Sequence, residues 1–355
     1  MFFAQIGSAA VVVMTSALLA GCTAPEPDAG NRSGTTGPRA TCSPAPPSAA
    51  LRFTAAGDYS FSPEAEAVLG CIGQSQPDLH LAVGDLSYGE AGEEHLWCDF
   101  VTQHVGEDLP FELLAGNHEG DGRNGLIDEF ADCLPNRLPG LQGEYGGQYF
   151  VDVPENDPLV RFVLISPAIA FADGVWDYGA DTERFEWTQA AITGARDVGI
   201  PWVVAGMHKP CHSIGDHPCE PGAAITNLLV DSGVDLVLSA HEHIYQRTHQ
   251  LQTGERCPHL PADAFEPGCL ADDDAEMLAG KGTVFVTVGT GGAPLHDVNP
   301  SDPDAGYFAV ASGANRDPAW GFVEVDADET GLSVSFRPVI GSFEDAFAIT
   351  SGGGR

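Results

Sequence analysis

Short apolar runs that each end in a cluster of polar residues constrain the fold of this chain more than any other feature. Seven such runs occupy residues 51–58, 78–85, 111–119, 160–166, 200–208, 234–243 and 283–290. Runs of this length are typical of central strands that are covered on both faces. Helix-like segments at 62–73 and 181–199 separate some of the runs, whereas two later apolar segments, 320–327 and 331–339, are joined directly. The pattern predicts a layered α/β fold that ends with an antiparallel pair of strands.

The polar residues that close these runs have the chemistry of metal ligands. In layered α/β folds, ligand-binding groups gather at the carboxyl ends of the strands. This rule brings together Asp58, Asp85, Asn117, His208, His241 and His243. Each motif alone also occurs in ordinary turns, and it is their order at successive strand ends that favours a site. Such a mixed set is too large for one four-coordinate zinc ion, but it suits two metal ions that share a carboxylate and clamp a phosphoryl group.

Five segments resemble the ordered motifs of a known family. They are "GDYSFS", "GDLSYGE", "GNHE", "GMHKP" and "SAHEHIYQR", which are similar to motifs of the calcineurin-like metallophosphoesterases and specifically of the purple acid phosphatases. Tyr88 falls three residues after Asp85, where the purple acid phosphatases keep a metal-bound tyrosinate. The resemblance covers roughly residues 51–345. It implies the metallophosphoesterase fold, an α/β layered β-sandwich core of two mixed sheets flanked by helices, with a dinuclear metal site at the strand carboxyl ends.

The resemblance also implies a role for each matching residue. The first metal ion would be held by Asp58, Tyr88 and His243, the second by Asn117, His208 and His241, and both by Asp85. His118 matches the outer-sphere histidine of the family, which contacts the substrate phosphate or the leaving group. Ser60 stands where many relatives carry a histidine ligand, so a phenolate replaces that nitrogen. A hard anionic donor favours Fe(III), which we expect beside a divalent Fe, Zn or Mn ion.

The cysteine spacing after His208 brings two more histidines toward the metals. A disulfide between Cys211 and Cys219 would close a short loop that carries His212 and His217. We expect His212 to act in the outer sphere of the metal site. The alternative is that it is a surface histidine.

The expected reaction is the metal-dependent hydrolysis of phosphate monoesters, as in acid phosphatases. A metal-bound hydroxide would attack phosphorus in line with the leaving group, and His118 would protonate the departing alkoxide. The same metal core would also serve a phosphodiesterase or a nucleotidase, which differ in the shape of the pocket. A third alternative is a lipoprotein that binds metal or phosphate without turnover, although pure binding would not need a leaving-group acid.

The amino terminus predicts export. Residues 1–22 predict an apolar signal peptide that ends in "LLAGC", which resembles the lipobox of bacterial lipoproteins, where Cys22 would be lipidated. Residues 23–50 have almost no large apolar side chain and predict a disordered linker. We expect the metallophosphoesterase domain at 51–345, a flexible tail at 346–355, and a cell-surface or extracytoplasmic lipoprotein that meets the membrane only through its lipid anchor.

Eight cysteines remain beside Cys22, and an even number in an exported chain favours disulfides over free thiols. The neighbouring pairs are the expected partners, Cys211 with Cys219 and Cys257 with Cys269.

The charge of the chain restricts its partners. Asp and Glu number 51 against 15 Lys and Arg, a formal net charge of −36. Such a surface repels nucleic acid and anionic lipid headgroups. The small phosphate ester expected from the metal site is also anionic, so the local positive charge of the metal ions must outweigh this repulsion at the cleft.

Overall fold

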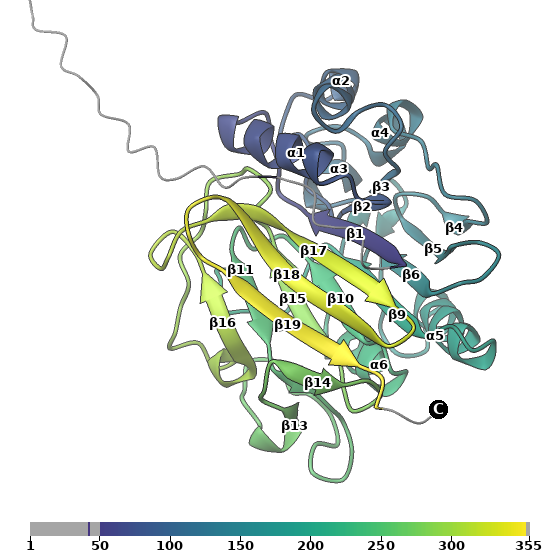
Figure 1. The fold of residues 1–355 in the computed structure, drawn as a ribbon, viewed down its shortest axis with the longest axis vertical. Helices are drawn as coiled ribbons and strands as arrows, with labels where there is room; N and C mark the ends of the chain where they lie inside the picture. The colour runs from purple at the N-terminus through teal and green to yellow at the C-terminus, as the bar shows by residue number, and fades with distance from the viewer. Residues whose placement is uncertain (1–41, 43–49, 353–355) are drawn as a thin grey trace, which may run out of the picture. The chain divides into compact units, whose positions relative to one another are not determined.

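The computed structural model describes residue 42 and residues 50–352, which form two large sheets and six α-helices (Figure 1). The strands of the first sheet are β1 (Leu51–Ala56), β2 (Leu79–Ala82), β3 (Phe111–Leu113), β14 (Glu276–Leu278), β17 (Trp320–Asp328), β18 (Gly331–Ile340) and β19 (Asp345–Thr350). The strands of the second sheet are β4 (Gln142–Glu144), β5 (Gln148–Val153), β6 (Val160–Ile165), β9 (Trp202–Met207), β10 (Leu236–Ser239), β11 (Tyr245–Thr248), β15 (Val284–Val288) and β16 (Phe308–Ser312).

The remaining elements are short ribbons and helices. The ribbons pair β7 (Ala170–Phe171) with β8 (Gly174–Val175) and β12 (Gln250–Leu251) with β13 (Leu270–Asp272). The α-helices are α1 (Pro63–Ser75), α2 (Glu94–Val105), α3 (Asn117–Gly120), α4 (Ile127–Cys133), α5 (Glu183–Asp197) and α6 (Ala223–Asp231), and the 3₁₀ turns are η1 (Pro267–Cys269) and η2 (Ala305–Tyr307). Within the described part of the chain, no helix combines the length and the apolar character needed to span a membrane.

Both sheets are mixed, as the resemblance to the metallophosphoesterases implied. The strand order is β14-β19-β18-β17-β1-β2-β3 in the first sheet and β16-β11-β15-β10-β9-β6-β5-β4 in the second. Strand β1 runs parallel to β2 and antiparallel to β17. Strands β6, β9, β10 and β15 are parallel neighbours, so their carboxyl ends meet at one edge of the sheet. The predicted antiparallel pair of late strands is confirmed as β17 and β18.

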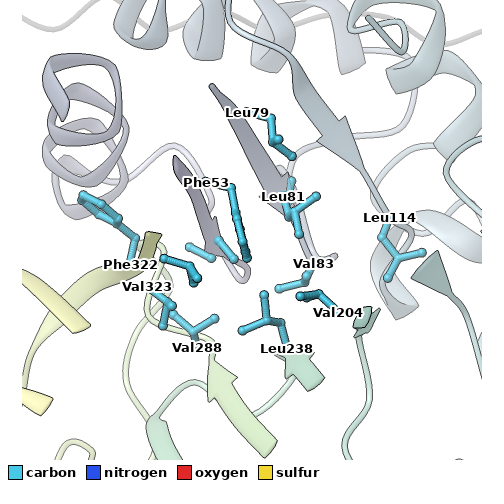
Figure 2. Close-up of a cluster of buried hydrophobic side chains, with 14 of the residues drawn as sticks. Phe53, Leu79, Leu81, Val83, Leu114, Val204, Leu238, Val288, Phe322 and Val323 are labelled. Atoms are coloured by element: carbon cyan, nitrogen blue, oxygen red, sulfur yellow. The ribbon is translucent and has the colours of Figure 1, made fainter. Parts of the chain in front are cut away.

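The core lies between the two sheets. Figure 2 shows Phe53 and Leu81 of the first sheet packed in one cluster with Val204 and Leu238 of the second. Phe53 meets Phe162 of β6 edge to face, with ring centroids 4.9 Å apart. Apolar burial between the sheets supplies most of the stabilising free energy of such a layered fold.

The central strands of the second sheet are buried on their other face as well. In β6, Phe162 faces the other sheet, whereas Val163 joins a second cluster with Ile192 of α5 and Leu229 of α6. Alternate residues of the strand therefore bury opposite faces, which explains why these strands are continuous apolar runs in the sequence. On the first sheet, α1 is capped by Ser62, which precedes the helix and whose side chain accepts a hydrogen bond from the backbone nitrogen of Ala65.

Four disulfides link the described cysteines. The expected pairs Cys211–Cys219 and Cys257–Cys269 are both present, and the others join Cys42 to Cys71 and Cys98 to Cys133. Disulfides persist in oxidising compartments, which is typical of an extracellular protein.

The boundaries of the domain differ from those expected. The predicted tail from 346 was wrong over its first part, because Ala346–Thr350 lies within β19, which pairs with both β18 and β14. At the other end, the Cys42–Cys71 disulfide joins the expected linker to helix α1. The predicted signal peptide, Cys22 and most of the linker lie outside the described residues.

Candidate metal centre

The predicted metal ligands follow the ends of neighbouring strands. Those from the first sheet are Asp58 after β1, Asp85 after β2 and Asn117 after β3, and those from the second are His208 after β9 and His241 and His243 after β10. Asp58, Asp85, Tyr88 and His241 all have positive φ angles, between 52° and 69°. L-residues rarely adopt this conformation, and it is concentrated where a site requires an unusual backbone.

One half of the cluster gathers around His208. Its Nε2 atom lies 3.2 Å from Asn117 Oδ1 and 3.3 Å from Asp85 Oδ1. Ligand atoms of Asp85, His208 and His241 all lie within 4.8 Å of one another, close enough to share an ion. The structure thus brings together the four residues expected around the second metal ion.

The other half gathers around Tyr88. Its hydroxyl lies 3.1 Å from Asp58 Oδ1, 3.1 Å from Asp85 Oδ2 and 2.9 Å from His243 Nε2. The two oxygens of Asp85 therefore face different halves of the cluster, Oδ1 toward His208 and Oδ2 toward Tyr88. This is the position expected of a bridging carboxylate.

Hydrogen bonds outside the cluster orient the imidazoles. His208 donates from Nδ1 to the Val83 carbonyl at 2.9 Å, and His243 donates from Nδ1 to the Pro294 carbonyl at 2.8 Å. Both histidines therefore present Nε2 to the carboxylates. His241 has the opposite arrangement. Its Nε2 atom contacts Glu220 Oε2 at 3.0 Å, so Nδ1 is the nitrogen that could bind a metal ion. Such partners fix the tautomer and the ring orientation of metal-binding histidines.

The backbone at Gly116 packs directly against the side chain of Asp85. A Cβ atom added to Gly116 would lie 2.0 Å from Asp85 Oδ1, so only glycine fits at this position. Glu119, fully buried, accepts hydrogen bonds from the backbone nitrogens of Asp85 at 3.0 Å and of Leu86 at 2.8 Å. The "GNHE" segment thus anchors the loop after β2 as well as supplying Asn117.

The site has polar atoms that the protein alone leaves unsatisfied. Asp58 Oδ2 is buried and has no hydrogen-bond partner among the described residues. Tyr88 has one hydroxyl proton for the three acceptors around it, on Asp58, Asp85 and His243. Buried polar atoms without partners are costly, and metal cations would satisfy them. The residues present therefore fit the two ions that the sequence predicted.

Burial dominates the electrostatics of the cluster. It raises the pKa of Asp58 above its ordinary value, in spite of the nearby His243 and His208. Burial acts in the same direction on Asp85, but His208 and His118 outweigh it and lower the pKa of that carboxyl. Burial, reinforced by Asp58 and Asp85, raises the pKa of the Tyr88 phenol. A phenolate here needs strong positive charge from outside the protein, which a bound cation supplies.

His118 lies beside the cluster with its ring fixed. Its Nδ1 atom donates to Asn124 Oδ1, its ring packs on Tyr88 with centroids 4.4 Å apart, and its Nε2 lies 3.6 Å from Asp85 Oδ2. Asn124 belongs to the segment "EGDGRNG", in which no feature indicates that it would support His118.

The loop closed by Cys211 and Cys219 places His217, and not His212, beside the predicted metal ligands. His212 is buried, its Nε2 donates to the Pro261 carbonyl at 2.9 Å, and its ring meets Tyr307. None of its described contacts involves a metal ligand, which leaves the expected outer-sphere role of His212 without support. The exposed His217 packs on His241 with ring centroids 4.1 Å apart.

One further histidine at the site was not predicted. The ring of His296 stacks on that of His243, with centroids 4.1 Å apart and an interplanar angle of 17°. Its segment, "APLHDV", follows the glycine-rich end of β15 and has no feature that distinguishes it from a loop.

Comparisons with known proteins agree with this geometry. A family model described as calcineurin-like phosphoesterase matches residues 53–245. The chain is 26% identical over 235 residues to purple acid phosphatase 18 of Arabidopsis thaliana, which covers 64% of this chain and 51% of that protein. It is 26% identical over 362 residues to an uncharacterised protein of Mycobacterium tuberculosis, which covers 82% of this chain and 66% of that protein.

Solved structures show the same fold. A purple acid phosphatase from yellow lupin seeds matches with a TM-score of 0.64 and 20% identity, over 87% of this chain and 55% of that chain. A dimetal phosphatase from Danio rerio matches with a TM-score of 0.52 and 13% identity, over 86% of this chain and 100% of that chain. The chain spans about half to two thirds of the length of the two curated relatives.

Proposed function

Because this chain belongs to the calcineurin-like phosphoesterase family, we propose that it hydrolyses phosphate monoesters with two metal ions as cofactors, as an acid phosphatase. The observation that carries the proposal is the position of Asp85, whose two carboxylate oxygens face the two halves of the ligand cluster. Enzymes with two metal ions at a shared carboxylate are suited to the in-line displacement of phosphoryl groups.

Seven side chains would hold the ions. The first ion would be held by Asp58, Tyr88 and His243, the second by Asn117, His208 and His241, and both by Asp85. When bound, the two ions lower the pKa of a water molecule to generate the nucleophile and neutralise charge on the phosphoryl oxygens. The phenolate ligand supports Fe(III) at the first position, with a divalent Fe, Zn or Mn ion at the second.

The proton for the leaving group would come from His118. Asn124 engages Nδ1, so Nε2 is the nitrogen that faces the cluster, beside Asp85. A donor held in this way can protonate the departing alkoxide as the P–O bond breaks, which removes the need for a good leaving group. No covalent intermediate with the protein is required.

The location and the partners of the protein follow from the sequence. We propose that the protein is exported, which the four disulfides among its described residues support, and that a lipid on Cys22 anchors it in the membrane. Its net charge of −36 opposes nucleic acid as a partner, and a small phosphate ester would be drawn to the site by the local positive charge of the metal ions.

The test is kcat/KM for an aryl phosphate monoester and the matching diester, across pH, on the metal-reconstituted protein with bound metal quantified. We expect two ions per chain, a preference for the monoester, and higher activity at acidic pH. A preference for the diester would replace the proposal with a phosphodiesterase. Two bound ions without turnover of either ester would favour a binding protein, and fewer than two ions would contradict the metal centre itself.

A further inference from the structure

Glu242 lies between His241 and His243 in the sequence, and metal binding does not explain its contacts. Glu242 is fully buried, and both of its carboxylate oxygens face the disulfide loop Cys211–Cys219. Its Oε2 accepts a hydrogen bond from the backbone nitrogen of Asp216 at 2.9 Å, and its Oε1 accepts one from that of His217 at 2.7 Å. Hydrogen bonds to an ionised carboxylate are among the stronger ones in proteins.

The loop is shaped around this carboxylate. A Cβ atom added to Gly215 would lie 2.2 Å from Glu242 Oε2 and 2.4 Å from its carboxyl carbon, so a side chain at this position would displace the carboxylate. A second support for the loop comes from Gln246 in the following strand, β11. The Ile214 nitrogen donates to Gln246 Oε1 at 3.0 Å, and Gln246 Nε2 donates to Ser213 Oγ at 3.0 Å.

The carboxylate of Glu242 also lies close to a second histidine at the site, His296. His296 Nδ1 lies 3.6 Å from Glu242 Oε2, and the His296 ring stacks on the metal ligand His243. His217 in turn packs on the metal ligand His241, and the rings of His217 and His296 are 6.0 Å apart. Glu242 therefore contacts both segments that bring an additional imidazole to the rim of the metal centre.

We propose that Glu242 is a positioning residue, which holds the loop 211–219 against the metal centre and so fixes His217 at the mouth of the site. The exposed imidazole of His217 can then donate an N–H to an anionic substrate without first being ordered by it. A third metal ion held by His217, Glu242 and His296 is the competing interpretation, since their ligand atoms lie within 4.8 Å of one another. It is disfavoured because both oxygens of Glu242 already accept backbone hydrogen bonds.

The first experiment measures hydrogen exchange at the amides of Asp216 and His217 in the full-length, metal-free protein. Glu242→Gln keeps the size of the side chain but presents a donor to one of the two amides, so exchange at these amides should become at least about tenfold faster. Gly215→Ala displaces the carboxylate without changing its charge and should give the same result. Asp297→Asn removes an exposed charge next to His296 and is the matched control, with no expected change. Unchanged exchange in both Glu242→Gln and Gly215→Ala would overturn the proposal.

The second experiment rests on the proposed function and uses the metal-loaded protein with an aryl phosphate. We expect Glu242→Gln to raise KM about tenfold with a smaller change in kcat, and to add little to the effect of His217→Ala in the double variant. Additive effects of the two variants would show that Glu242 does not act through His217. A third bound ion that is lost in Glu242→Gln would favour the competing metal site. If the wild type had no activity, the proposed function would fail, whereas the exchange measurement would still decide the role of Glu242.

Discussion

Replacing Asn124 by alanine tests how the proton donor is held. Asn124 accepts from Nδ1 of His118 and donates from its own Nδ2 to the Gly89 carbonyl at 2.6 Å. Alanine removes both contacts, so His118 keeps its packing on Tyr88 but loses the group that fixes its tautomer and rotation. Loss of a supporting partner of this kind costs about 10-fold to 100-fold in activity, which corresponds to about 1.4–2.7 kcal/mol in the barrier. The cost should stay below that of His118→Ala, for which loss of general acid catalysis predicts about 10²-fold to 10⁴-fold.

The assay is kcat for two phosphate monoesters, one with 4-nitrophenol and one with a simple alcohol as the leaving group. Because only the poor leaving group needs a proton, Asn124→Ala should lose little activity on the aryl ester and show the full loss on the alkyl ester. Arg123→Ala is the matched control, since its exposed side chain lies in the same loop, and it should leave both rates unchanged. An equal loss on both esters, or a loss that adds in full to that of His118→Ala, would refute the reasoning.

Three further predictions follow from the site and the core. Protein isolated with ferric iron should be purple or pink, and Tyr88→Phe should lose this colour in the visible spectrum; a coloured variant would contradict the tyrosinate ligand. Chelation of the metals should lower Tm, because an ion at a free concentration of about 100 times its Kd stabilises the native state by about 2.7 kcal/mol. An unchanged Tm would contradict metal binding at the ends of the strands. Burial raises the pKa of Glu112 from its ordinary 4.5 to about 7, although backbone hydrogen bonds oppose the shift. The native state therefore holds a proton that the unfolded state has lost, and the free energy of unfolding should fall by about 3 kcal/mol as the pH rises from 4.5 through 7. Urea unfolding at pH 5 and pH 8 should show that Glu112→Gln removes this fall, and a fall of the same size in the variant would contradict the assignment to Glu112.

The sequence predicted the elements that are buried on two faces and the polar residues at their ends. Strands such as β9 and β10 are apolar over almost their whole length because a second sheet covers one face and helices cover the other. A buried strand must surface at its end, so His208 follows β9 directly and His241 lies two residues after β10. Most of the candidate ligands could be predicted because they lie within a few residues of recognisable strands, whereas Tyr88 was inferred from the resemblance to the purple acid phosphatases.

The supporting residues were not predictable because they act through backbone contacts made far away in the sequence. Glu119 was visible in "GNHE", but its hydrogen bonds go to the loop after β2, 33 and 34 residues earlier. Glu242 was visible in "HEH", but its partners lie 25 and 26 residues earlier, in the disulfide loop. The sequence could not indicate which of His212 and His217 in that loop lies beside the candidate ligands, since the course of an irregular loop depends on what it packs against.

Helix α2 and strand β19 were missed because their local signals are weak. Helix α2 has no side-chain hydrogen bond at its N-cap, and its buried face depends on Trp97 and Val101 packing under neighbouring helices. Strand β19 is six residues long and exists through pairing with strands on both of its sides.

The division of the ligands between the two sheets has a consequence for assembly of the molecule. Asp58, Asp85 and Asn117 follow strands of the first sheet, and His208, His241 and His243 follow strands of the second. Neither sheet alone therefore offers a complete set of metal ligands. Tight metal uptake must therefore follow the docking of one sheet on the other, and during refolding the appearance of bound metal would time that docking event. The metal ions then join segments of the chain that are distant in sequence, much as a late cross-link would, and an unfolding pathway that begins by separating the sheets would have to release them first.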